Sequence, residues 1–219
     1  MQIEEFENIR KFKCDKRDTT TNDVRFRELS YLAPKIGTWG SCLEFGVFSG
    51  ATINHVSSLL PNMKFHGFDS FEGLPEDWNM GGKMVKKEAF DRQGNMPEVN
   101  QNVHLYKGWF SDTLTPWLGL NTMPVSFLHI DSDVYSSAAY VLDTLNYRIR
   151  PGTIIRFDEL SCWRTVFSEV SPPNVQRVGY STWEDHEWKA LNEWLTKYDR
   201  KVTPISRDWF QGGSVIVTQ

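Results

Sequence analysis

The stretch Val125-Ser126-Phe127-Leu128-His129-Ile130-Asp131-Ser132-Asp133 decides how this chain is expected to fold. It is an apolar run that ends in acids, and a second run, Gly152-Thr153-Ile154-Ile155-Arg156-Phe157-Asp158-Glu159, follows the same design. Each run is typical of a buried strand. In open α/β sheets ligands bind outside the carboxyl ends of the strands, so we expect the two acidic ends to meet in one crevice. Clustered carboxylates repel unless a cation compensates them, which indicates a divalent cation beside a substrate.

Strand and helix patterns alternate along the rest of the chain. We expect helices near residues 2–12, 22–36, 51–60, 135–148 and 184–198, and strands near residues 41–45, 64–68, 102–107, 125–130 and 153–158. Two further strands, 201–206 and 214–218, read as a terminal hairpin. The sequence thus predicts one α/β domain over residues 1–219. Its Rossmann-like, mostly parallel seven-stranded sheet would carry a C-terminal antiparallel hairpin and helices on both faces.

The composition limits the classes of protein to consider. A length of 219 residues suits one α/β domain, and a net charge of -4 argues against a nucleic-acid-coating protein. The residues contain no apolar run of transmembrane length and no apolar segment after Met1 that is typical of a signal peptide. Cys14, Cys42 and Cys162 are widely spaced, which is typical of reduced thiols in a cytoplasmic protein.

A glycine-containing turn lies at the first strand-to-helix junction. Gly46 and Gly50 allow a tight turn and a close approach of the backbone to a ligand. Asp69 ends the next strand, where dinucleotide-type folds place an acid on the ribose hydroxyls. The chain has neither GxGxxG nor GxxxxGK[ST], so a standard nicotinamide fingerprint and a P-loop are both excluded. The alternative is that these glycines only close a turn.

Four blocks carry a resemblance to a known family. They are Leu43-Glu44-Phe45-Gly46-Val47-Phe48-Ser49-Gly50, Gly67-Phe68-Asp69-Ser70-Phe71-Glu72-Gly73-Leu74-Pro75, Gly108-Trp109-Phe110-Ser111-Asp112-Thr113-Leu114 and Asp131-Ser132-Asp133-Val134-Tyr135-Ser136-Ser137. Together, over roughly residues 40–160, they resemble the macrocin O-methyltransferase family. The resemblance implies a class I S-adenosylmethionine-dependent methyltransferase that modifies sugars of natural products.

The resemblance also implies roles for single residues at the cofactor. Glu44 and Gly46 would lie beside the methionine part of S-adenosylmethionine, Asp69 would hold the ribose hydroxyls, and Ser111 would lie against the adenine. The expected cofactor-binding set is Glu44, Gly46, Gly50, Asp69, Ser70, Ser111 and Asp131.

A magnesium site is implied in the same way. Asp131, Asp158 and Glu159 match the magnesium ligands of the family, although the last pair there is Asp-Asp and here is Asp-Glu. Glutamate is still a hard oxygen ligand, so we expect Mg2+ at these three residues.

Methyl transfer from a sulfonium needs an aligned oxygen nucleophile and a group that accepts its proton. Asp131, Asp133 and His129 are the candidates for that group. Alternation along the strand puts His129 and Asp131 on one face. The alternatives are that His129 is a hydrogen-bonded core residue and that Asp133 is the N-cap of the next helix.

Two other functions remain open from the sequence: a nucleotide-cofactor oxidoreductase on a similar sheet, and a cofactor-binding scaffold without turnover. The expected partner is a hydroxylated small molecule, with sugar, phenol and polyketide not distinguished, and neither nucleic acid nor membrane. Whether several copies assemble is left open.

Residues 72–100 form a polar stretch too long for an ordinary connection. We expect a loop with one short helix near residues 85–90. With the N-terminal helical segment, residues 1–35, it would form a lid over the acceptor. Trp78, Met80 and Met84 would contact the acceptor or pack the loop down.

Overall fold

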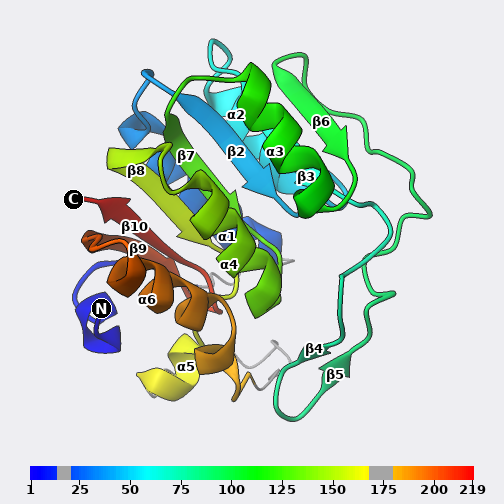
Figure 1. Cartoon of the computed structure of the whole chain (residues 1–219). Helices are drawn as coiled ribbons and strands as arrows, with labels where there is room; N and C mark the ends of the chain where they lie inside the picture. The colour runs from blue at the N-terminus through cyan, green and yellow to red at the C-terminus, as the bar shows by residue number, and fades with distance from the viewer. Residues whose placement is uncertain (14–20, 168–179) are drawn as a thin grey trace.

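The computed structural model describes residues 1–13, 21–167 and 180–219, so Cys14 lies outside the described residues. One eight-stranded sheet has the order β1-β9-β10-β8-β7-β2-β3-β6 (Figure 1). Its strands are β1 (Arg10–Phe12), β2 (Ser41–Phe45), β3 (Phe65–Asp69), β6 (Val103–Lys107), β7 (Val125–Ile130), β8 (Ile149–Phe157), β9 (Val202–Asp208) and β10 (Gly213–Val217).

The sheet confirms the predicted fold class. β8, β7, β2, β3 and β6 are parallel to one another, and β10 is antiparallel to both β8 and β9. The terminal hairpin therefore exists, but its antiparallel strand lies inside the sheet. β1 is an eighth strand beyond the predicted seven and pairs parallel with β9.

The helix predicted over residues 2–12 is wrong. A short 3-10 helix, η1 (Ile3–Phe6), buries Phe6 in the core, and the chain then extends into β1. The pairing of Arg10 with Ser206 and of Phe12 with Asp208 covers the edge of β9, which outweighs the local helical pattern.

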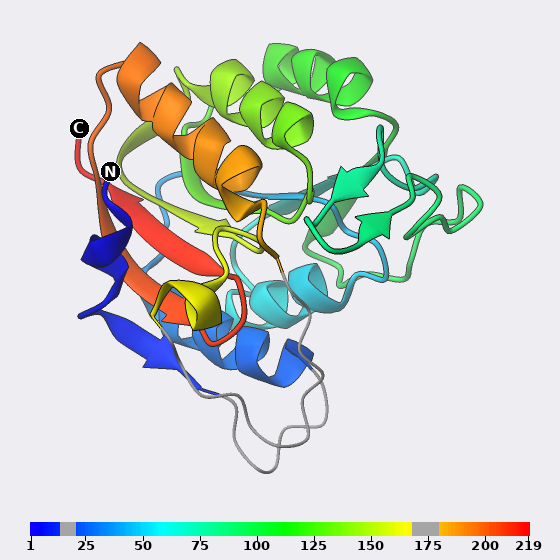
Figure 2. The same cartoon turned by 90° about the horizontal axis from the view of Figure 1, so that it is seen from below.

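Helices cover both faces of the sheet (Figure 2). On one face lie α1 (Thr21–Leu32), its continuation η2 (Ala33–Lys35) and α2 (Ala51–Leu59). On the other lie α3 (Phe110–Leu120), α4 (Tyr135–Leu145) and α6 (Glu187–Lys197), with the short α5 (Trp163–Val166) and η3 (Trp183–Asp185) near the strand ends. Among the described helices, none is long and apolar enough to cross a membrane.

Alternation along the strands makes two cores. On β7, Leu128 and Ile130 belong to the cluster under α3, α4 and α6, whereas Phe127 belongs to the cluster under α1 and α2. Because side chains alternate, His129 shares the side of Phe127. His129 and the polar residues aligned with it on neighbouring strands therefore face α1 and α2.

The stretch over residues 72–100 contains a small hairpin, β4 (Trp78–Asn79) and β5 (Met84–Val85), which lies beyond the ends of the parallel strands (Figure 1). The short helix expected near residues 85–90 is wrong, because turns and a left-handed Phe90 occupy that range. Trp78 and Met80 are buried, and Met84 is half exposed. The backbone N–H of Ser181 donates to the carbonyl of Met80 at 3.1 Å, so the hairpin is docked on the chain near η3.

Candidate active site

The first part of the site is the glycine turn, residues 46–50, between β2 and α2. The carboxylate of Asp69, at the end of β3, accepts hydrogen bonds from the backbone N–H groups of Val47 and Phe48, both at 2.7 Å. Its other oxygen accepts from the N–H of Phe71 at 2.7 Å. Asp69 therefore fixes the glycine turn through backbone groups alone, and its expected contact with ribose hydroxyls stays a prediction.

Gly46 joins the glycine turn to the end of β7. Its φ is +91°, and a Cβ at this position would lie 1.7 Å from the carbonyl oxygen of Asp131. The N–H of Asp131 donates to the carbonyl of Phe45 at 2.8 Å. Only glycine allows this approach, because any side chain would push the two strand ends apart. Gly50, with φ +78°, precedes α2 and donates its N–H to Val47 at 2.8 Å.

The two serines expected at the cofactor lie in turns. The Ser70 hydroxyl donates to the carbonyl of Gly73 at 3.0 Å and accepts from the N–H of Glu72 at 3.1 Å. Ser111 is exposed in the first turn of α3, just after Gly108 at the end of β6. Both lie just beyond the carboxyl ends of β3 and β6, and their contact with a cofactor stays a prediction.

A buried polar row crosses the sheet under α1 and α2. Its members are register partners on five adjacent strands, in the order Glu44, His129, Arg156, Ser214 and Ser206. Every side chain of this row is buried, which places charged groups in an otherwise apolar sheet.

Hydrogen bonds connect the polar row. Glu44 accepts from the Thr52 hydroxyl at 2.9 Å, and its second oxygen lies 2.8 Å from Nδ1 of His129. Nε2 of His129 lies 2.9 Å from Nη1 of Arg156. Glu28, from α1, accepts from the hydroxyls of Ser206 and Ser214 and lies 3.4 Å from Nε of Arg156.

The row fixes the side chain of His129. Burial by itself lowers the pKa of His129, but the neighbouring carboxylates of Asp158 and Glu44 raise it overall. With both ring nitrogens engaged, His129 is the hydrogen-bonded core residue that the sequence left as an alternative.

The second part of the site is a pair of acids at the ends of β7 and β8, Asp131 and Asp158, which we call the acid crevice because open α/β sheets form their ligand crevice at these strand ends. Arg25, from α1, contacts Asp158 through Nη2 and lies 3.5 Å from Asp131 through Nη1. Arg156 contacts the other oxygen of Asp158. Burial would raise the pKa of Asp158, but the charges of Arg25 and Arg156 hold it well below its usual range.

A further acidic cluster lies beside the crevice and consists of Asp133, Glu159 and Glu187. Glu159 donates its backbone N–H to the carboxylate of Glu187 at 2.9 Å. Burial raises the pKa of all three carboxyl groups well above the usual range, and neighbouring acids raise it further. Asp133 makes no N-cap, because Val134 occupies that position without a side-chain cap.

The predicted magnesium ligands are only partly brought together. Within the described part of the chain, potential ligand atoms of His129, Asp131 and Asp158 lie within 4.8 Å of one another, and Glu159 is not in this group. Arginine side chains use both oxygens of Asp158, and Arg25 also contacts Asp131. This donor set does not fit a divalent cation, because hard cations need several free oxygen ligands.

Sequence reasoning missed four charged residues of the site: Arg25, Glu28, Arg156 and Glu187. Arg156 had a usable signal, because it interrupts an apolar strand two residues before Asp158 and so shares its face. Arg25 and Glu28 stand at i, i+3 on α1, but nothing in that spacing indicates which strand ends they reach.

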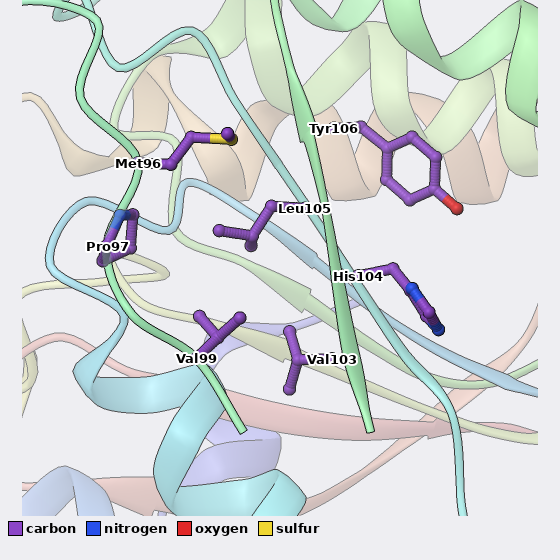
Figure 3. A pocket seen from close by; sticks show the side chains of 7 residues that line it. All are labelled: Met96, Pro97, Val99, Val103, His104, Leu105 and Tyr106. Atoms are coloured by element: carbon purple, nitrogen blue, oxygen red, sulfur yellow. The ribbon is translucent and has the colours of Figure 1, made fainter. Parts of the chain in front are cut away.

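A surface pocket of about 460 Å³ lies elsewhere, on the outer strand β6 (Figure 3). Its lining consists of Met96, Pro97, Val99, Val103, His104, Leu105 and Tyr106. None of the acids described above lines this pocket, so it is separate from the acid crevice.

Comparison with known families identifies the fold that carries the glycine turn and the acid crevice. The sequence model of a family described as "Methyltransferase domain" matches residues 43–160, which is more than half of the chain. The chain belongs to this methyltransferase domain family. The match runs from β2 to just beyond β8 and so includes the glycine turn, Asp69 and the acid crevice. A comparison with curated proteins finds no match.

Solved methyltransferases share the fold. The calicheamicin methyltransferase CalS11 is 19% identical, with a TM-score of 0.59, covering 92% of this chain and 80% of its own. TomG from Streptomyces achromogenes, solved with S-adenosylmethionine, is 15% identical with a TM-score of 0.54, covering 93% and 83%. MycE, solved with Mg and S-adenosylhomocysteine, is 14% identical with a TM-score of 0.50, covering 88% and 49%.

Proposed function

We propose that the protein is an S-adenosylmethionine-dependent O-methyltransferase that acts on a hydroxyl group of a small molecule. The family match and the fold shared with solved O-methyltransferases support this function. The observation that carries it is the contact between Gly46 and Asp131, because it sets the glycine turn directly against the acid crevice. A cofactor at the turn and an acceptor in the crevice would then meet at the end of β7.

Asp131 is our candidate for the group that accepts the proton. Its side chain is 23% exposed, whereas His129 is fully buried and Asp133 is 7% exposed. In the proposed step, the acceptor hydroxyl gives its proton to the Asp131 carboxylate while its oxygen forms a bond to the methyl carbon. The sulfur–methyl bond breaks, its electron pair stays on sulfur, and the sulfonium becomes the thioether S-adenosylhomocysteine. His129 would take no part in proton transfer and would only connect β2, β7 and β8 through its contacts with Glu44 and Arg156.

Buried polar atoms near the crevice support a hydroxylated acceptor. Trp78 Nε1, Tyr180 OH, Ser132 Oγ, Glu159 Oε2 and Glu187 Oε1 have no hydrogen-bond partner among the described residues. Leaving buried polar groups unpaired is costly, so a ligand with several hydroxyl groups is a good candidate to satisfy them. A natural-product sugar meets this requirement, and we include it in the proposal.

The lid belongs to the proposal as well. The hairpin β4–β5 is held near η3 by the Thr182 hydroxyl and His186, which both donate to the carbonyl of Asn79, at 2.6 and 2.9 Å. Ser136 donates to Glu76 at 2.6 Å, which attaches the same loop to α4. An apolar cluster that buries Trp78 and Met80 with Tyr180 and Trp183 holds the hairpin as well, so the proposed lid would open by breaking both kinds of contact. No step here depends on a magnesium ion, because the donor set at the crevice does not fit one.

The test is a screen for acceptor-dependent release of S-adenosylhomocysteine with panels of sugars, phenols and polyketides. We expect release with at least one hydroxylated acceptor and a large loss of rate in Asp131→Asn. Asp199→Asn, at an exposed acid between α6 and β9, is the matched control and should keep its rate. Binding of NAD without binding of S-adenosylmethionine would instead favour the oxidoreductase. Binding of S-adenosylmethionine without turnover on any acceptor would favour the scaffold.

A further inference from the structure

Arg25 stands where the sequence predicts a divalent cation. Its two terminal nitrogens reach Asp158 and Asp131, the two carboxylates shared by the predicted magnesium set and the observed cluster of potential ligands. A guanidinium keeps its charge at all physiological pH values and presents its donors as a rigid fork, which suits it to bridging two carboxylates. The compensating charge that the acids require is therefore supplied by the chain itself.

The surroundings of Asp158 leave little room for a second cation. Arg156 contacts Oδ1 of Asp158, and Arg25 contacts Oδ2. Magnesium demands near-octahedral oxygen ligands, and here both oxygens of the central carboxylate already serve arginines. An added divalent ion would also lie beside two positive side chains, which is electrostatically unfavourable.

Arg25 is held in this position by its helix. Glu28, one turn along α1, is fully buried and accepts hydrogen bonds from Ser206 at 2.7 Å and Ser214 at 2.9 Å. The same carboxylate lies 3.4 Å from Arg156. Residues three apart share one face of a helix, so the anchor at Glu28 directs Arg25 into the crevice. Its side chain is only 22% exposed.

We propose that Arg25 takes the place of the divalent cation in the acid crevice and is a positioning residue for the acceptor side of the reaction. It holds Asp131 and Asp158 at a fixed separation and offers a permanent positive charge to the acceptor oxygen. The inference rests on the proposed function, but its test needs neither an acceptor nor turnover.

The experiment measures binding of Mn2+ alone, by the electron paramagnetic resonance signal of free Mn2+, to the full chain. Arg25→Met removes the charge, and Arg25→Lys keeps it without the fork. Lys35→Met is the control. It removes one positive charge, as Arg25→Met does, but Lys35 lies on η2 over the Tyr31 ring and contacts neither acid of the crevice. Circular dichroism checks folding, and calorimetric titration with S-adenosylhomocysteine checks the cofactor end in each variant.

We expect the wild type, Lys35→Met and Arg25→Lys to show no saturable Mn2+ binding below about 1 mM. Arg25→Met should gain a site with a dissociation constant at least about tenfold below that limit, because Asp131 loses its counter-charge and Asp158 keeps only Arg156. Asp158→Asn in the Arg25→Met background should remove that site. Saturable Mn2+ binding to the wild type that Asp131→Asn abolishes would overturn the inference, and this measurement decides the matter even if Arg25→Met does not fold. If the wild type does not bind S-adenosylhomocysteine, that result would instead contradict the proposed function, whatever the outcome of the Mn2+ titrations.

Discussion

Asp69 and Asp158 each stand at the end of a parallel strand, but they are held in opposite ways. Asp69 accepts from three backbone N–H groups, all within a few residues of the β2 and β3 ends. Asp158 is held by the side chains of Arg25 and Arg156, and Arg25 is 133 residues away along the chain. The glycine turn is thus built by local backbone geometry, whereas the acid crevice depends on a network of distant side chains. The turn should therefore depend on Asp69 and the glycines alone, whereas the crevice should depend on several side chains from distant parts of the chain.

The largest effect should come from removing the centre of the network. Arg156→Met leaves Glu28, Asp158 and Asp208 buried without their shared guanidinium. Breaking a buried charge network in this way costs about 3–5 kcal/mol of the free energy of unfolding. Arg150→Met, an exposed position on the same strand, should cost about 0.5 kcal/mol or less. Urea unfolding of both variants measures the difference, and equal midpoints would mean that the network does not stabilise the crevice.

A smaller effect should separate the two glycines of the turn. Gly46→Ala combines a positive φ with a clash against the Asp131 carbonyl, so we expect it to destabilise the protein by about 3 kcal/mol. Gly50→Ala has a positive φ but meets only side-chain atoms, of Pro97 at 3.3 Å and of Asn54 at 3.4 Å, and should cost about 1 kcal/mol. Thermal unfolding at matched concentrations compares the two. A larger cost for Gly50→Ala would show that the contact between the turn and the crevice is not the constraint we infer.

The pH dependence of methyl transfer tests the crevice from another side. Burial, followed by the charge of Asp158, raises the pKa of Asp131 to about 6, while Arg25 opposes the rise. A carboxyl group can accept the proton only when it is ionised, so the rate should fall as the pH drops through about 6 and level off above it. Rates measured from pH 5 to 8 with a working acceptor check this. A flat profile over that range would remove Asp131 as the base.

The smallest effect should concern the hairpin. Lys83, Lys86 and Lys87 are exposed on or beside it, and trypsin should cut there more slowly once S-adenosylhomocysteine and an acceptor are bound. Lys201, exposed between α6 and β9, is the internal control and should be cut at the same rate in both states. If protection is absent at the hairpin, acceptor specificity must be sought in another segment.

The same contrast explains how much could be predicted from the sequence. The strands and helices around the glycine turn follow from local patterns, since each apolar run and each glycine acts on its immediate neighbours. The helix expected near residues 184–198 is observed as α6, and its Leu191, Trp194 and Leu195 are buried at helical spacing. The helix prediction for residues 2–12 is wrong because pairing with β9, nearly two hundred residues away, overrides local propensity.

The crevice was predictable only in its acids. Asp131 and Asp158 were placed together by the rule that parallel strands end on one side of the sheet. The expected third ligand, Glu159, lies with Glu187, and the third potential ligand in space is His129. Neither Arg25 nor Glu28 could be assigned to the crevice from the sequence. The pattern of a helix does not tell which strand ends its polar face will reach.

One calorimetric titration tests the central claim. The claim is that the glycine turn, held by local contacts, binds the cofactor independently of the acid crevice, which is held by distant side chains. S-adenosylmethionine is titrated, in buffer with EDTA, into the wild type, Asp69→Ala and Asp158→Asn. The account predicts saturable binding to the wild type, binding weakened by about a hundredfold in Asp69→Ala as the turn loses its two hydrogen bonds to that carboxylate, and nearly unchanged binding to folded Asp158→Asn. No binding to the wild type, or equal losses in both variants, would contradict it.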